Sequence, residues 1–193
     1  VYKRQGMDYV LENEQIDMSL TLFNADLENE INGFVYDPAT YAYTSGNMNG
    51  SSKRKGLEIS LVGDLTETLS FSSSYTHVKA DQKNDGTRVR EIRRPNHMAN
   101  FGINWAPSSS MKIMMNSQFV GSQLDTYYPP FPANPEQVKM AGHTLVDLSI
   151  NYEMSDDLMI LLTIENVFDD NYEEVFGYKT LGLGGSVGFR YQM

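Results

Sequence analysis

Aromatic side chains are concentrated in the long polar segments of this chain, where they are available to bind a ligand. A phenyl or phenol ring offers a large contact area at a low entropic cost. Rings that gather in a wet vestibule therefore suit the capture of a bulky molecule. The candidate ligand-binding residues are Tyr41, Tyr43, Tyr127, Tyr128, Phe131, Tyr172, Phe176 and Tyr178.

Side chains for metal binding or hydrolysis are sparse. The three histidines, His77, His97 and His143, show no metal-ligand spacing, and we expect structural or rim positions for them, at strand ends on different hairpins. A hydrolase at the rim would require a pair such as His77 and Asp81, which the many neighbouring carboxylates make unspecific. The chain has no cysteine, which excludes a disulfide scaffold and cysteine-ligated metal. We predict no catalytic residue, no metal site and no cofactor.

The elements that must hold these loops alternate in polarity. In the last 36 residues, 158–193, Ile160, Leu162 and Ile164 share one parity, and Val187 and Phe189 share one parity of a second run. This pattern predicts a β-hairpin with one apolar face, which occurs both in half-buried sheets and in membrane barrels.

Six further runs of alternating residues precede that hairpin, at 16–31, 48–62, 69–78, 97–105, 113–119 and 143–153. In the first run the alternation slips near Phe23, which predicts a β-bulge. Residues 7–11 resemble the stump of an earlier strand whose partner is missing. The predicted inward polar row contains Glu58, Asn100, Asn104, Asp147, Asn151, Glu153 and Glu165.

The connections alternate strictly in length. Turns near Gln15, Asp64, Pro107 and Ser155 are short, whereas the connections near 37, 85, 130 and 172 are long. Outer-membrane barrels have short periplasmic turns and long outer loops, whereas soluble sandwiches have no reason for this asymmetry. The prediction is an all-β, antiparallel, up-and-down barrel segment of about eight strands, curved and open at both edges. In a barrel, the loop aromatics would equally suit a girdle at the headgroup level.

The composition of the chain limits the classes of molecule that it can bind. The net charge of −10 argues against a nucleic-acid partner. No window approaches about 20 continuous apolar residues, which excludes a membrane helix but not barrel strands of about ten alternating residues. The chain begins at Val1 without a secretory leader, so we interpret it as a fragment and residues 1–6 as a possible non-native remnant.

Three separated stretches carry a family resemblance. The run Ile164-Glu165-Asn166-Val167-Phe168-Asp169-Asp170-Asn171-Tyr172-Glu173-Glu174-Val175-Phe176-Gly177-Tyr178 resembles the end of TonB-dependent outer-membrane receptors. Lys55-Gly56-Leu57-Glu58 and Arg93-Arg94-Pro95-Asn96-His97 are similar to further segments of that family. The chain departs from it at Leu181-Gly182-Leu183, where P-G-R is common, and at Met193, where Phe or Trp is usual.

The resemblance implies that residues 7–193 are the C-terminal part of a receptor barrel in the outer membrane of a Gram-negative bacterium. The implied function is energy-coupled uptake of a bulky nutrient, a metal chelate (siderophore) or cobalamin. The implied partners are this ligand, outer-membrane lipid, and the periplasmic protein TonB, which would act through the missing N-terminal part. Two alternatives remain: a complete small eight-stranded barrel that anchors the envelope or adheres to surfaces, and an outer-membrane enzyme.

Overall fold

The protein is all-β in the computed structural model, which describes residues 2–11, 15–47, 50–84 and 86–192. Its main sheet has ten strands, of which nine follow the order β1-β2-β5-β6-β8-β9-β12-β13-β16 and β7 pairs with β6. Each strand along this path pairs with its neighbours in antiparallel orientation, so the sheet is an up-and-down meander. The strands are β1 (Tyr2–Leu11), β2 (Ile16–Glu28), β5 (Gly50–Thr66), β6 (Leu69–Asn84), β7 (Thr87–Arg90), β8 (His97–Ser108), β9 (Met111–Val120), β12 (His143–Ser155), β13 (Leu158–Glu165) and β16 (Gly184–Tyr191).

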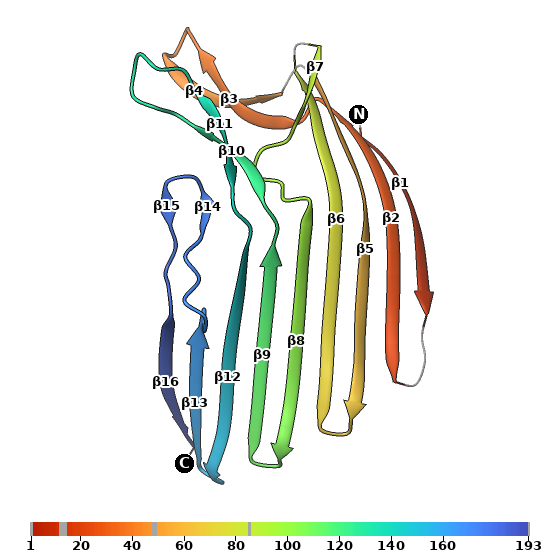
Figure 1. The fold of residues 1–193 in the computed structure, drawn as a ribbon, viewed down its shortest axis with the longest axis vertical. Helices are drawn as coiled ribbons and strands as arrows, with labels where there is room; N and C mark the ends of the chain where they lie inside the picture. The colour runs from red at the N-terminus through yellow and green to blue at the C-terminus, as the bar shows by residue number, and fades with distance from the viewer. Residues whose placement is uncertain (1, 12–14, 48–49, 85, 193) are drawn as a thin grey trace.

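The two ends of the sheet differ, as the sequence predicts. At one end the turns Glu67-Thr68, Ser109-Ser110 and Asp156-Asp157 join consecutive strands directly. At the other end the connections are long and form hairpins of their own beyond the sheet (Figure 1). These are β3 (Ile31–Asp37) with β4 (Ala42–Asn47), β10 (Gln123–Tyr127) with β11 (Glu136–Met140), and β14 (Glu173–Val175) with β15 (Tyr178–Lys179).

The register places the predicted apolar residues on one face of every strand. Residues directly opposite each other in a ladder share a face. Ile59 pairs with Tyr75, which pairs with Ala99, and Ile150 pairs with Leu162, which pairs with Val187. We call this the outward face, and the face that carries Arg54, Glu58 and Asn100 the inward face. The parity prediction is confirmed across the meander.

In the described part of the chain, no segment packs over the outward face. Among the described residues, the buried hydrophobic side chains are only Ala25, Leu27, Ala80 and Met140. Val187 and Phe189 are 62% and 70% exposed, which excludes a dry core on this face. A large continuous apolar surface of this kind is typical of a protein–protein or membrane interaction site. From Leu57 to Gly63, which lies opposite Phe71, the outward row runs for about 20 Å along the strand at about 3.3 Å per residue.

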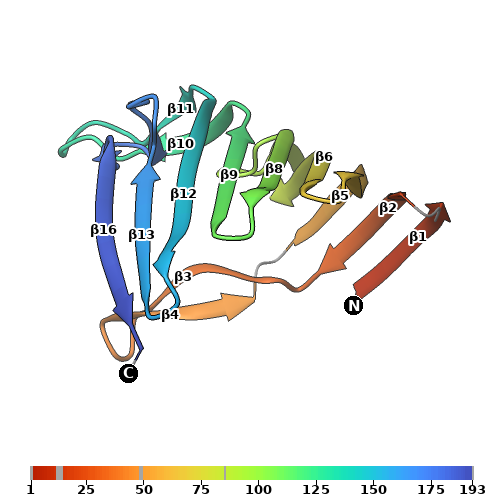
Figure 2. The same cartoon turned by 90° about the horizontal axis from the view of Figure 1, so that it is seen from below.

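The sheet is a curved, open wall. Figure 2 shows it as an arc with β1 and β16 at its two ends and the β3–β4 hairpin lying across its concave side. In the described part of the chain β1 and β16 do not pair with each other, so no cylinder closes. The inward face is the concave one, because Glu30, where the chain leaves β2 for β3, contacts Arg54. The described residues contain no helix that is long and apolar enough to cross a membrane.

Two local predictions about the first strands are wrong. The register of β2 with β5 is continuous from Ile16 opposite Gly63 to Glu28 opposite Ser51, so there is no bulge at Phe23. The pattern slips because the inward face becomes apolar at Ala25 and Leu27, which are buried, while the strand continues unchanged.

The opening residues form a strand that the sequence pattern did not predict. Residues 2–5 do continue a strand, because β1 pairs with β2 from Tyr2 opposite Leu27 to Leu11 opposite Met18. Residues 7–11 therefore have a partner, and β1 adds a ninth strand to the eight predicted. The strand β5 also runs through the predicted turn at 63–67 and ends at Thr66, after a register shift between Asp64 and Thr66.

Candidate functional site

The candidate site lies at the long-loop end of the sheet, where the hairpins meet. Local turn chemistry shapes two of them. In the β3–β4 turn, Asp37 accepts hydrogen bonds from the Ala39 amide at 2.9 Å and the Thr40 hydroxyl at 2.9 Å. In the β14–β15 turn, Gly177 has a φ of 84°, a conformation that glycine adopts without the penalty of a side chain.

Asp125 joins three of these loops. Its side chain is fully buried, at 0% exposure. Oδ1 accepts hydrogen bonds from Arg93 Nε and the Thr126 amide, both at 2.8 Å, and Oδ2 accepts one from the Phe176 amide at 2.9 Å. Arg93 comes from the β7–β8 connection, and Phe176 from the β14–β15 hairpin. This carboxylate therefore holds the β10–β11 hairpin against loops on both sides.

Further contacts support the same junction. The Arg93 amide donates to the Leu124 carbonyl at 2.7 Å, and Gln123 Nε2 donates to the Glu174 carbonyl at 3.1 Å. Tyr127 packs edge-on against Phe176, with ring centroids 5.3 Å apart. We call Arg93, Asp125 and Phe176 the loop clamp.

The clamp is sensitive to acid. Burial alone would raise the pKa of Asp125, but hydrogen bonds from the Phe176 amide and Arg93 outweigh it, so the pKa lies below its usual value. Because the pKa is lower in the folded protein, the ionised carboxylate contributes its full stabilisation at any pH above the unfolded-state pKa of about 3.9. This contribution is lost as the pH falls through the folded-state pKa.

We therefore expect the β10–β11 and β14–β15 hairpins to separate below about pH 4. Spin labels on Ala133→Cys and Lys179→Cys should report a distance distribution that broadens in that range in the full-length receptor. Asp125→Asn, which cannot titrate, should show no transition there. An identical acid transition in the Asp125→Asn protein would assign the change to another group.

The inward face carries a second charged cluster beside the clamp. Arg54 donates to both oxygens of Glu91 at 3.1 Å and forms an ion pair with Glu30 at 2.9 Å. Glu91 is 4% exposed and also contacts Arg94 at 3.4 Å. These pairs connect β5 to the start of the β3–β4 excursion and to the β7–β8 connection. Two carboxylates therefore face Arg54, the inward cation of β5.

Two hollows adjoin the clamp. A pocket of about 220 Å³ on the inward face is lined by Arg93, Gln118, Val120, Gln123, His143 and Glu174. A larger one of about 430 Å³ lies between the end of β11 and the β14–β15 hairpin and includes Tyr172 and Phe176. The Tyr172 ring, which lines the larger hollow, stacks with centroids 4.2 Å apart on buried His143, which lines the smaller one.

The eight predicted aromatic residues divide into two groups. Tyr127, Tyr172 and Phe176 pack within the loop assembly, and Tyr43 packs on Tyr36 with centroids 5.3 Å apart. The others present their rings to solvent at hairpin ends. Their exposed fractions are 83% for Tyr41, 72% for Tyr128, 98% for Phe131 and 73% for Tyr178.

The histidines lie on three different hairpins, as predicted, and two of them are in contact. His77 and His97 lie directly opposite each other on β6 and β8, with ring centroids 4.6 Å apart. His97 and His143 begin β8 and β12, whereas His77 lies inside β6 and not at its end. Nδ1 of His97 is 2.7 Å from the Tyr75 hydroxyl. His77 and Asp81 lie four positions apart on β6, each opposite a different residue of β5. Among the described residues no group of three or more His, Asp or Glu side chains is arranged to hold a metal ion.

Sequence reasoning missed the clamp and the Arg54 cluster. Asp125 lies in a segment that reads as a plain loop, and its partners Arg93 and Phe176 are 32 and 51 positions away. The one available signal was the pair Arg93-Arg94 itself, because arginines that become partly buried are usually paired with acidic groups.

Comparison with solved structures supports this architecture. The chain superposes on the ferripyoverdine receptor of the Pseudomonas aeruginosa outer membrane with a TM-score of 0.75 at 20% identity, covering 98% of this chain and 26% of that one. It superposes on the ferric-catecholate import receptor Fiu of E. coli K12 with a TM-score of 0.71 at 19% identity, covering 98% of this chain and 27% of that one. It superposes on the siderophore receptor PirA of Acinetobacter baumannii with a TM-score of 0.72 at 15% identity, covering 98% of this chain and 31% of that one.

The chain thus spans roughly a quarter to a third of the length of these structures, and the likeness establishes a shared fold. The family model described as TonB dependent receptor-like, beta-barrel matches residues 6–167, which is most of the chain. With an open antiparallel meander, an uncovered apolar face and hairpins on one rim only, the chain belongs to the TonB-dependent receptors, which reside in the outer membrane of Gram-negative bacteria.

Proposed function

We propose that this chain forms the C-terminal wall of a receptor that imports an iron–siderophore chelate with energy coupled through TonB. The observation that carries the proposal is the clamped rim, in which rigidly joined hairpins present exposed rings beside a polar inward pocket. Flat rings bind the apolar and aromatic parts of a bulky chelate, while polar groups fix its orientation.

The solved neighbours favour a siderophore as the ligand. Those compared above are a ferripyoverdine receptor, a ferric-catecholate import receptor and a siderophore receptor. Cobalamin, the other ligand that the sequence suggests, has no corresponding support among them. The coupling partner TonB would act through parts of the receptor outside these residues.

A direct binding assay on the full-length receptor tests the ligand class. Ferripyoverdine, a ferric catecholate and cobalamin would each be titrated against the receptor in detergent, with binding followed by isothermal calorimetry. We expect saturable binding of at least one ferric chelate and none of cobalamin. Binding of cobalamin alone, or of none of the three, contradicts the proposal.

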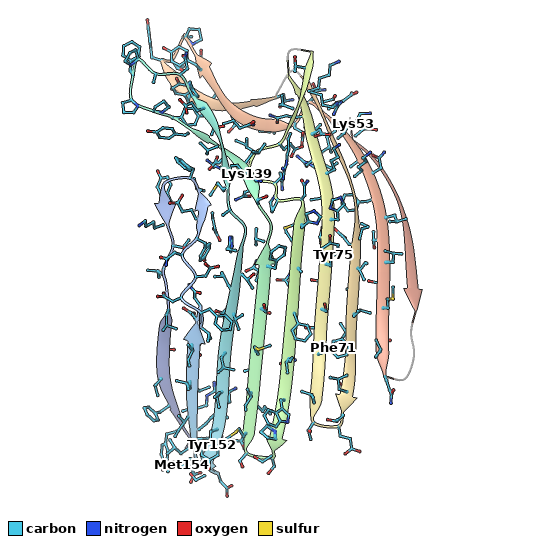
Figure 3. All side chains as sticks on the ribbon, in the orientation of Figure 1. Lys53, Phe71, Tyr75, Lys139, Tyr152 and Met154 are labelled. Carbon is cyan, nitrogen blue, oxygen red and sulfur yellow. The ribbon has the colours of Figure 1, made fainter. Side chains whose placement is uncertain are left out.

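The exposed rings of the β10–β11 hairpin provide the residue-level test. Tyr128→Ala with Phe131→Ala should weaken chelate affinity about tenfold, since about 1.4 kcal/mol of ring contact corresponds to that factor. The matched control is Tyr152→Ala, which removes a 40% exposed ring near the opposite end of the sheet (Figure 3). Equal affinities for the double variant and the control would assign the hairpin rings a girdle role.

A further inference from the structure

Basic side chains gather on the outward face where β5, β6 and β7 extend past the apolar band. The register shows that these side chains are on the outward face. Lys55 lies opposite Lys79, and Lys83 lies opposite Arg88. Asp81 lies opposite Lys53 on one side and Arg90 on the other. The chain as a whole carries a net charge of −10, so this concentration runs against its composition. The outer basic patch consists of Lys53, Lys55, Lys79, Lys83, Arg88 and Arg90.

The height of the patch is set by the apolar band. Leu57 is the last apolar outward residue of β5, and it lies in one row with Leu22 and His77. Lys55 is two residues further along, which is about 7 Å in a strand. Figure 3 shows the same sequence of levels, with Phe71 lowest, Tyr75 above it and Lys53 at the upper end of the wall. The patch is therefore at headgroup level, on the side of the long loops.

Most of these cations have no anionic partner in the protein. Lys53 forms an ion pair with Asp26 at 3.2 Å. Arg90 donates to the backbone carbonyls of Arg94 at 3.3 Å and Ser122 at 3.4 Å. Within the described ranges, the other four, Lys55, Lys79, Lys83 and Arg88, form no ion pair. Like charges directly opposite each other in a ladder are destabilising, as for Lys55 and Lys79. Arg54, between Lys53 and Lys55 but facing inward, is paired with two carboxylates.

We propose that the outer basic patch binds the phosphate groups of a glycolipid headgroup in the outer leaflet. Lysine ammonium and arginine guanidinium groups at a membrane surface attract anionic headgroups, by about 1 kcal/mol for each cation. A lipid suits the position better than a soluble anion, because its acyl chains would lie along the apolar rows of Leu57 and Ile59 directly below. The bound phosphates would supply the counter-charge that Lys55 and Lys79 lack.

Native mass spectrometry of the full-length receptor with bisphosphorylated lipid A tests the proposal. The wild-type receptor should retain lipid A and should bind its dephosphorylated form at least about tenfold more weakly, because two phosphates face several cations. Lys55→Gln with Lys79→Gln should lower retention of the phosphorylated form by a similar factor, and Lys55→Arg with Lys79→Arg should preserve it. Heat-modifiable migration on gels confirms that each variant is folded.

The matched control is Lys112→Gln with Arg190→Gln, which removes the same charge from exposed inward positions at the short-turn end. This control should retain lipid A like the wild type. Equal losses in the two double variants would show that net charge, and not the patch, governs retention. Stabilisation of the receptor by inorganic phosphate to the same extent as by lipid A would also overturn the proposal, in favour of a soluble anion.

Discussion

Leu162→Arg is expected to abolish stable insertion of the receptor, whereas Thr163→Arg, one residue along the same strand, is expected to be tolerated. Leu162 lies on the outward face between Ile150 and Val187, and Val187 is 62% exposed, so an arginine there must leave water for hydrocarbon. That transfer costs about 2 to 4 kcal/mol at the bilayer midplane. Thr163 lies on the inward face between Ser149 and Ser186, where the lumen solvates a charge.

Both sites belong to β13 and have almost the same depth in the membrane. The two variants therefore differ mainly in which face of the sheet carries the arginine. The measurement is the fraction of full-length receptor that migrates as a heat-modifiable folded barrel after refolding into lipid vesicles. The Leu162→Arg protein should show little folded barrel, and the Thr163→Arg protein should be close to the wild type. Similar losses for the two variants would mean that the assignment of the outward face is wrong.

Asp125→Ala is expected to release the loop clamp while leaving the wall intact. Removal of the carboxylate leaves the Phe176 and Thr126 amides and the Arg93 guanidinium without their acceptor. Loss of an acceptor from partly buried donors, one of them charged, costs about 3 kcal/mol. This corresponds to roughly a hundredfold faster hydrogen exchange at the Phe176 amide, if that amide exchanges by local opening of the hairpin.

Hydrogen exchange followed by mass spectrometry on the full-length receptor measures this effect. Peptides from β14–β15 and β10–β11 should lose protection, and peptides from β12 and β13 should not. Asp37→Ala is the matched control, since its carboxylate bonds only within its own turn, to Ala39 and Thr40. Unchanged protection at β14–β15 in the Asp125→Ala protein would show that the clamp does not hold the hairpins together.

The wall could be predicted from sequence because its determinants are local and periodic. The alternation of Ile160, Leu162 and Ile164 assigns a face without knowledge of any partner, and a two-residue turn then brings the next strand into register. Phe23 shows where this reasoning fails. Its inward neighbours Ala25 and Leu27 are apolar and buried although the inward face is otherwise polar, and no local pattern carries that information.

The rim was less predictable, because its contacts join segments far apart in the sequence. The aromatic residues of the loops could be selected by type, but their roles could not, since Tyr127 packs on Phe176 whereas the nearby Phe131 is 98% exposed. Asp125 was missed altogether, because a single aspartate among 25 acidic residues carries no mark of its burial. Its importance depends on Arg93 and Phe176, which only the folded meander brings together.

The pairing of each wall strand with its neighbour along the chain has a kinetic consequence. Three of the hairpins, β5–β6, β8–β9 and β12–β13, are closed by turns of two residues, so their contacts require almost no loop-closure entropy. The long excursions then join hairpins already formed, which keeps the average sequence separation of wall contacts low. The wall can therefore grow by successive addition of preformed hairpins at an open edge. The Asp125 contacts, which bridge three excursions, can form only after the strands that carry them are in place.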